Sequence, residues 1–149
     1  MPQLSMHTPL GDLTVSEENG AIVSLDWGWS PMQQETPLLI EARDQLDRYF
    51  DGEPIIFDLP LNDWGTDYQR RVWAEIRRVP YGRTASYADV AYQIGSGPRA
   101  VGMACGRNPI PIITPCHRIL ASGGKIGGYS GAEGLTTKRA LLRLEGYLT

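Results

Sequence analysis

The hydrophobic pattern of the chain changes its period once, close to residue 64, and no other feature restricts the fold as strongly. Before that point, three short apolar or alternating runs occupy residues 4–7, 13–16 and 21–27, with turn-forming Gly, Pro, Asn and Asp between them. Alternation over a few residues between turn signals is typical of antiparallel strands. We therefore expect a three-stranded antiparallel meander at the start of the chain.

A helix should follow the meander. Thr36 can cap its first turn, and Pro37 suits the first helical position. Apolar residues then recur at helical spacing until Gly52. The segment 52–65 has the composition of a connector, with one more short strand at residues 55–57 as an alternative. These patterns predict an N-terminal α/β domain over residues 1–63.

The remainder, residues 64–149, has helical periodicity. Thr66 and Gln69 form a capping box for a helix that Pro80 ends. A basic helix over residues 136–146 should pack back on this domain, and three residues make its apolar side: Ala140, Leu141 and Leu144.

Two short helices lie between those elements. Ser86 and Asp89 repeat the capping signature, and a Gly-containing turn at residues 94–97 separates the first short helix from a second one through residue 106. This is the spacing of a helix-turn-helix, although such pairs also occur as plain packing units. The predicted fold class is α+β, in which a small sheet with one helix precedes a mostly helical, winged helix-turn-helix domain.

The net charge of −3 conceals an asymmetry between the two halves. Residues 1–63 carry 12 acidic and 2 basic side chains, whereas residues 64–149 carry 5 acidic and 12 basic ones, so the halves have net charges of −10 and +7. An acidic protein can therefore still present a cationic face to a polyanion. Solvated surface charge without a partner is the alternative at this point.

Composition excludes several classes of protein. The chain has no run of 18 apolar residues and no signal-peptide pattern, so we expect a cytoplasmic protein without a membrane segment. Its two cysteines and two histidines provide neither a disulfide framework nor a four-ligand zinc site, and we expect no metal and no cofactor. A thiol in such a chain is either buried or reactive.

The apolar, strand-like run of residues 112–120 is interrupted by Cys116, His117 and Arg118. An imidazole can take the proton of a nearby thiol, and a nearby guanidinium favours the thiolate, which is the nucleophile. A buried cysteine is also often an inert small hydrophobe. Residue types alone leave both interpretations open.

Several motifs in the second half together resemble the O6-alkylguanine-DNA alkyltransferase family. The resemblance is continuous from about residue 66 to 146, and the first domain fits the family's ribonuclease-H-like unit in outline only. The motifs are Ser96-Gly97-Pro98-Arg99-Ala100-Val101-Gly102, Arg107-Asn108-Pro109, Pro115-Cys116-His117-Arg118-Ile119 and Gly127-Gly128-Tyr129-Ser130-Gly131.

The resemblance implies direct-reversal DNA repair by a protein that is consumed in one turnover. Cys116 would accept a methyl or other alkyl group from guanine O6, with thymine O4 a further possibility in substrate range. His117 would draw the thiol proton through a water molecule, and Glu145 would orient His117. Tyr87 would assist departure of guanine.

The resemblance also implies how DNA is bound. The nucleotide is flipped out, Arg99 acts as an arginine finger or a phosphate contact, and the second helix lies in the minor groove with little sequence readout. Ala100, Gly102 and Ser86 would lie against the DNA. The pocket for the base would be walled by Ile126, Tyr129, Ser130 and Gly131.

Asn108 matches the asparagine that ties the recognition helix to the active-site strand, and Cys105 matches no catalytic position, so we expect a packed thiol there. We expect a monomer. Three other classes remain as alternatives: a protein that binds the alkyl lesion without removing it, a helix-turn-helix regulator, and a cysteine hydrolase with multiple turnovers.

Overall fold

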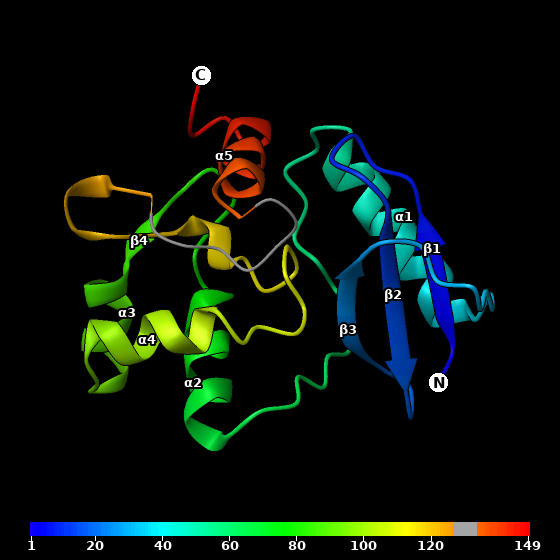
Figure 1. The fold of residues 1–149 in the computed structure, drawn as a ribbon, viewed down its shortest axis with the longest axis horizontal. Coiled ribbons are helices and arrows are strands. Elements are labelled where there is room, and N and C mark those ends of the chain that lie inside the picture. The colour runs from blue at the N-terminus through cyan, green and yellow to red at the C-terminus, as the bar shows by residue number, and fades with distance from the viewer. Residues whose placement is uncertain (127–133) are drawn as a thin grey trace. The chain divides into compact units, whose positions relative to one another are not determined.

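Two compact units make up the chain, Met1–Trp64 and Gly65–Thr149. The computed structural model describes residues 1–126 and 134–149. The expected fold class is confirmed: a three-stranded antiparallel sheet with one helix precedes a mostly helical unit (Figure 1). Within the part of the chain that the structure describes, none of the helices combines the length and apolar character needed to cross a membrane.

Unit 1 is a meander covered by one helix. Strands β1 (Gln3–Met6), β2 (Leu13–Glu18) and β3 (Ala21–Trp27) pair antiparallel in that order, and a bulge interrupts β2 between Ser16 and Glu17. Helix α1 (Pro37–Phe50) starts where the sequence predicts, because Thr36 accepts a hydrogen bond from the Leu39 amide. The core is apolar and includes Leu13, Ile22, Leu39 and Leu46.

The suggested strand at residues 55–57 is absent. Ile56 is 91% exposed, and the ring of Phe57 packs against Tyr49 of α1. The backbone beyond it is held by a side chain, since Gln45 donates to the Asp58 carbonyl and accepts from the Asp58 amide. The apolar run of residues 55–57 thus packs in part on a helix, and the chain meets the sheet later, in a bridge between Ile22 and Leu61.

Unit 2 has three helices around a common core. Helix α2 (Asp67–Ile76) has the predicted capping box, and so does α3 (Tyr87–Ile94), which ends at Gly95 in the left-handed conformation. Helix α4 (Pro98–Cys105) follows after a short turn. The buried indole of Trp73 donates to the Ala104 carbonyl at 2.8 Å, which fixes α4 on α2.

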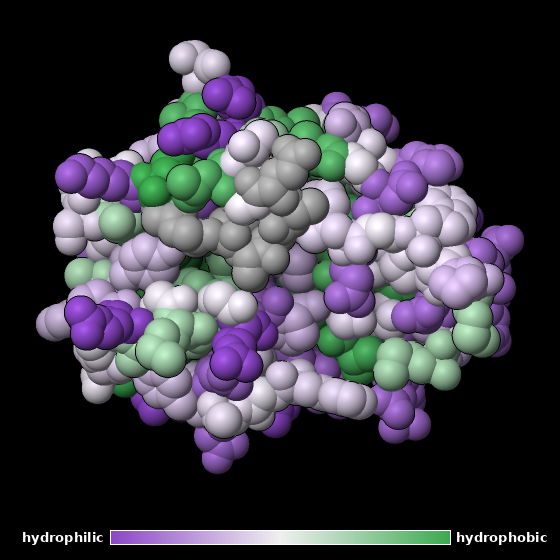
Figure 2. All heavy atoms as spheres, in the orientation of Figure 1, coloured by the Kyte–Doolittle hydropathy of each residue, from purple (hydrophilic) through white to green (hydrophobic). Residues whose placement is uncertain are grey.

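The last part of unit 2 carries the remaining elements. Strand β4 (Ala85–Ser86) pairs parallel with β5 (Ile119–Leu120), which follows the 3₁₀ helix η1 (Cys116–Arg118). Another 3₁₀ turn, η2 (Ser122–Gly124), precedes helix α5 (Leu135–Leu144). Hydrophobic residues come to the surface in small groups among hydrophilic ones, one of them over α5 (Figure 2).

Two details of this region differ from expectation. The run of residues 112–120 is a strand only at Ile119–Leu120, because Ile112 has a φ of +73° and prolines flank the bend. The face of α5 that faces the core is rotated from the predicted one. Its buried residues are Thr137, Lys138, Leu141 and Leu142.

Candidate active site

The 3₁₀ helix η1 brings three reactive side chains into the core of unit 2. Cys116, His117 and Arg118 are all buried there. A 3₁₀ helix has three residues per turn, so successive side chains point about 120° apart. The three residues therefore meet different partners, although they are neighbours in sequence.

The thiol of Cys116 is bonded by Asn108 and belongs to the same core cluster as Cys105. Asn108 donates through Nδ2 to Cys116 Sγ at 3.3 Å and to the Thr114 carbonyl at 2.9 Å. The hydrogen bond with Cys105 is the main reason that the pKa of Cys116 is raised well above its usual value, and burial adds to it. Asn108 and the charge of Lys138 act in the opposite direction. The resting thiol is therefore protonated at neutral pH.

His117 and Glu145 form a closely bound pair. Nε2 of His117 lies 2.5 Å from Oε2 of Glu145, and both side chains are fully buried. Burial lowers the pKa of His117, so the ring is neutral at neutral pH. With Nε2 donating to the carboxylate, Nδ1 is the basic nitrogen, and it is buried with no hydrogen-bond partner among the described residues.

Arg118 pairs with Glu145 and not with the thiol. It donates to the carboxylate through Nε at 2.8 Å and Nη2 at 3.1 Å, and to the Val79 carbonyl at 2.8 Å. Burial alone would raise the pKa of Glu145, but the hydrogen bonds and charges of His117 and Arg118 lower it to about 2. The expectation that this guanidinium promotes the thiolate is wrong.

Lys138, which was not among the residues predicted from the sequence, supplies the charge near the thiol. Its side chain is fully buried, donates to the Ile119 carbonyl at 2.6 Å, and lies 5.7 Å from the centre of the Tyr87 ring. Burial lowers the pKa of Lys138. A lysine on a basic helix predicts a solvated surface charge, so its burial was not visible from local pattern.

Tyr87 stands at the start of α3, half-buried beside the same groups. Burial, followed by the charges of Cys105 and Cys116, raises the pKa of Tyr87 to about 12, so its hydroxyl remains a donor. A Cβ at Gly102 would be in ordinary contact with the Tyr87 ring at 3.9 Å. Cys105 packs in the shared core cluster, as expected of a buried thiol.

Three of the residues predicted to meet DNA lie on α4, and the fourth caps α3. Arg99 and Ala100 are exposed, Gly102 is half-buried, and Ser86 uses its hydroxyl to cap α3. Ile126 is half-buried. Tyr129, Ser130 and Gly131, the other expected pocket residues, lie outside the described residues.

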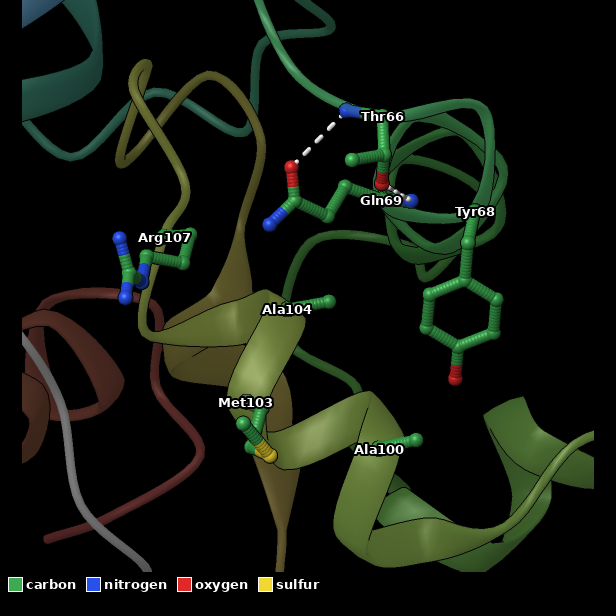
Figure 3. A pocket seen from close by; sticks show the side chains of 7 residues that line it. All are labelled: Thr66, Tyr68, Gln69, Ala100, Met103, Ala104 and Arg107. Atoms are coloured by element: carbon green, nitrogen blue, oxygen red, sulfur yellow. Dashed lines mark hydrogen bonds between the residues drawn. The ribbon is translucent and has the colours of Figure 1, made fainter.

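A groove of about 460 Å³ runs along α4 within unit 2 (Figure 3). Ala100 and Met103 project from α4, Arg107 follows the helix, and the capped start of α2 lies across from them. Tyr68 of α2 holds the turn before α4 by a 2.6 Å hydrogen bond between its hydroxyl and Ser96. No group of three or more His, Cys, Asp or Glu side chains suited to a metal ion occurs among residues 1–126 and 134–149.

The fold and the site together define a class: a helix-turn-helix unit that buries a cysteine near a histidine–glutamate pair. Two family models match the chain. The 6-O-methylguanine DNA methyltransferase DNA binding domain covers residues 67–147, and the ribonuclease-like domain of the same enzymes covers residues 4–62. The chain therefore belongs to the 6-O-methylguanine DNA methyltransferase family.

Individual relatives agree over nearly the whole length. The chain is 43% identical to the constitutive methylated-DNA–protein-cysteine methyltransferase of Bacillus subtilis, over 93% of this chain and 91% of the relative. The enzyme of the same name from Mycobacterium tuberculosis is also 43% identical, with 95% and 90% covered. A crystal structure of Mycobacterium tuberculosis OGT in complex with DNA superimposes with a TM-score of 0.87 at 41% identity, covering 97% of this chain and 92% of that one.

Proposed function

We propose that this chain repairs alkylated DNA by moving an alkyl group from guanine O6 to Cys116 in a single turnover. The family and the names of the relatives support direct reversal by transfer to a cysteine. The observation that carries the assignment to Cys116 is its neighbour His117 in the same 3₁₀ segment, which is buried and paired with Glu145 at the end of α5, with Nδ1 free to accept a proton. The other cysteine, Cys105, has no base paired in this way among the described residues.

The proposed transfer has a balanced set of bonds. His117 takes the thiol proton through a water molecule, Cys116 Sγ attacks the alkyl carbon in line, a C–S bond forms and the C–O6 bond breaks. Charge that develops on the departing guanine is met by the hydroxyl of Tyr87, which the pKa of about 12 keeps protonated. A thioether is stable, and among residues 1–126 and 134–149 no side chain beside Cys116 is suited to cleave it, so the protein is consumed.

Glu145 and Asn108 are positioning residues in this scheme. Glu145 holds the His117 tautomer, and its own charge is balanced by Arg118. Asn108 joins the end of α4 to the segment that carries the thiol, since it also accepts from the Ile110 amide at 2.9 Å. The Asn108 side chain thereby links helix α4, which would contact the lesion, to the acceptor Cys116.

We propose that double-stranded DNA lies along the exposed side of α4, with the helix in the minor groove, and that a monomer binds it with little sequence preference. Small residues at Ala100 and Gly102 permit close approach of the helix backbone. Ser86, at the start of α3, would lie against the same duplex. Ile126 and the segment 129–131 would wall the pocket for the flipped base. Residues 1–63 would form a separate N-terminal domain, and residues 64–149 the domain that binds and reacts.

The test is the intact mass of the protein after mixing with duplex DNA that contains O6-methylguanine. We expect a gain of one methyl group, mapped to Cys116, that saturates at one per molecule and is absent in Cys116→Ala. Lesion binding without a mass gain would replace the proposal by a recognition protein without chemistry. Repeated turnover of an ester or amide would point to a hydrolase, and sequence preference unaffected by Cys116→Ala would point to a regulator.

Substitution of Arg99 distinguishes two modes of DNA contact. If Arg99 fills the space of the flipped nucleotide, Arg99→Ala slows transfer from a duplex far more than from a single strand, where no gap needs filling. Arg107→Ala is the matched variant, because Arg107 is an exposed cation beyond the same helix. Loss of a phosphate contact instead weakens binding to both substrates and reduces the salt slope by about 1. Equal behaviour of the two variants would make Arg99 a phosphate contact.

A further inference from the structure

Three large side chains form a stripe along the exposed side of α4. Arg99, Met103 and Arg107 follow one another at intervals of four residues, and in a helix of about 3.6 residues per turn this spacing puts them on one face. Arg107 lies just beyond the end of α4, where Gly106 keeps helical backbone angles (φ −66°, ψ −14°). All three residues are exposed. Met103 therefore occupies the middle of the stripe, with a cation one turn away on either side.

The core of unit 2 does not account for Met103. This residue is 70% exposed, and it lines the groove along α4 together with Ala100 and Arg107 (Figure 3). Among residues 1–126 and 134–149, no acidic side chain lines this groove, and neither arginine of the stripe has a carboxylate partner. An apolar side chain between two unpaired cations suits the minor groove of DNA, which has phosphates along both edges and the edges of the bases on its floor.

The width of a helix conflicts with the width of that groove. An α-helix with its side chains is about 10–12 Å across, whereas the minor groove of B-form DNA is about 6 Å wide. Small residues such as Ala100 and Gly102 reduce the conflict, but Met103 increases it, because its long side chain stands in the middle of the face. Apolar side chains, methionine among them, act as wedges in minor-groove proteins by entering between base steps and kinking the duplex. Met103 is thus placed to deform DNA.

Its position along the helix separates Met103 from Arg99. Four residues at about 1.5 Å each place the two residues about 6 Å apart along the helix axis, which corresponds to roughly two base pairs at about 3.4 Å each. If Arg99 fills the space of the flipped nucleotide, Met103 meets a base step about two base pairs away. A duplex that is already kinked and partly unstacked lowers the cost of extruding a nucleotide close to the kink.

We propose that Met103 is an apolar wedge, which widens the minor groove and partly unstacks the duplex about two base pairs from the flipped nucleotide. The proposal rests on the proposed placement of α4 in the minor groove. The wedge deforms the duplex as the protein binds, whereas Arg99 fills the gap after the nucleotide has left. Since Met103 carries no charge, its removal should leave the salt dependence of DNA binding unchanged.

The first experiment measures the bend of the DNA. A duplex with O6-methylguanine at its centre and a dye at each end is saturated with the full chain carrying Cys116→Ala, so that no transfer alters the DNA during the measurement. Energy transfer between the dyes should rise on binding, because the duplex bends. Adding Met103→Ala should reduce that rise, and Met103→Leu, which keeps a large apolar side chain, should retain it. Met103→Gln, which keeps the length but adds a polar amide, should behave like the alanine variant.

The second experiment uses chains with the acceptor thiol intact and compares single-turnover transfer from a duplex with transfer from a single strand. In Met103→Ala the ratio of the two rates should fall about tenfold, because only the duplex has to be unstacked. Met103→Leu should keep the ratio. The matched control is Met32→Ala in unit 1, since Met32 is similarly exposed, at 67%, and should leave the ratio unchanged.

An unchanged bend together with an unchanged ratio in Met103→Ala would overturn the wedge, and so would an equal loss in Met103→Leu and Met103→Ala. The bend is read without the acceptor thiol, so it does not depend on alkyl transfer. A wild-type protein that bends the duplex through Met103 but accepts no methyl group would overturn the proposed function and leave the wedge standing. A protein that accepts the group with a bend independent of Met103 would do the reverse.

Discussion

The two units bury different kinds of polar groups. In unit 1 the buried polar residues are neutral except for Asp63, whereas unit 2 buries a histidine, an arginine, a lysine and a glutamate. The buried polar residues of unit 1 are Ser5, Thr14, Ser16, Gln45 and Asp63, and those among the described residues of unit 2 are Thr114, His117, Arg118, Thr137, Lys138 and Glu145. Buried charges oppose folding unless they are paired and hydrogen-bonded.

Ion pairs differ in the same way. Several pairs of unit 1 lie at its surface, such as His7 with Asp12, whose side chains are 82% and 39% exposed. Those around Glu145 are almost completely buried. Unit 1 therefore resembles an ordinary small domain in its buried groups. In unit 2, the burial of charged groups lowers the free energy of unfolding but holds reactive groups in place.

The largest expected effect comes from Glu145→Gln. It leaves Arg118 as a buried cation without its carboxylate, and we expect a loss of about 3–5 kcal/mol of unfolding free energy in unit 2. The rate of transfer should fall as well, because His117 loses the group that fixes its tautomer. Urea unfolding of the full chain, with amide hydrogen exchange to assign the loss to a unit, measures the stability change.

Asp12→Asn is the matched variant in unit 1. It removes a similarly short contact, 2.6 Å to His7, from an exposed position, and should cost less than about 1 kcal/mol. Similar costs for the two variants would remove the distinction between the units.

Acid should destabilise unit 2 in a way that unit 1 does not share. The pKa of Glu145 is about 2 in the folded protein, against an ordinary value of 4.5, so its contribution is complete above pH 4.5 and is lost as the pH falls towards 2. The loss is roughly 3 kcal/mol. His117 acts in the same direction below pH 6.5, because the folded state keeps it neutral and the unfolded state binds a proton.

Unit 1 contains a carboxyl group whose pKa shift has the opposite sign to that of Glu145. Burial, with the charges of Asp51 and Asp44, raises the pKa of Asp47, although Arg43 opposes the rise, so its protonation favours the folded state as the pH falls. Hydrogen exchange against pH should show unit 2 opening first. Loss of protection in unit 1 at a higher pH than in unit 2 would contradict this order.

Local chemistry explains which parts of the fold the sequence predicts. The three capped helix starts at Thr36, Thr66 and Ser86 depend on residues within one turn, and all three have the expected hydrogen bonds. The alternative of a strand at residues 55–57 is wrong because a short apolar run is the same in sequence whether it packs on a sheet or on a helix. The distinction needs the position of Tyr49, which local pattern does not contain.

The side-chain contacts of the site were harder to predict from the sequence than the fold, for the same reason. Arg118 follows the acceptor in sequence and looked like its partner, yet the 3₁₀ turn directs it to Glu145. Lys138, 22 positions after Cys116, provides the nearby cation instead. The proposed roles of His117 and Glu145 came from resemblance to a family, and they remain predictions.

A smaller effect should follow from removing one of two equivalent side-chain bridges. Asn108 in unit 2 and Gln45 in unit 1 each join a loop by one donated and one accepted backbone hydrogen bond. Asn108→Ala and Gln45→Ala should each cost about 1–3 kcal/mol, since buried partners are left unsatisfied. Only Asn108→Ala should slow alkyl transfer, measured in single turnover with saturating DNA. A matching slowdown in Gln45→Ala would mean that general loosening, and not the aim of Cys116, controls the rate.

The smallest effect concerns the helix caps, where the two units should be alike. Thr36 and Thr66 each accept a hydrogen bond from an amide three residues on, at 3.1 Å in both cases. Replacing either by alanine removes one cap and should cost about 1 kcal/mol. Thr66 also lines the groove beside α4, so Thr66→Ala should weaken duplex binding at low salt if DNA occupies that groove, while Thr36→Ala should not. Equal stability losses with unequal DNA affinity would show that the units differ in what they bury and bind, and not in how their helices begin.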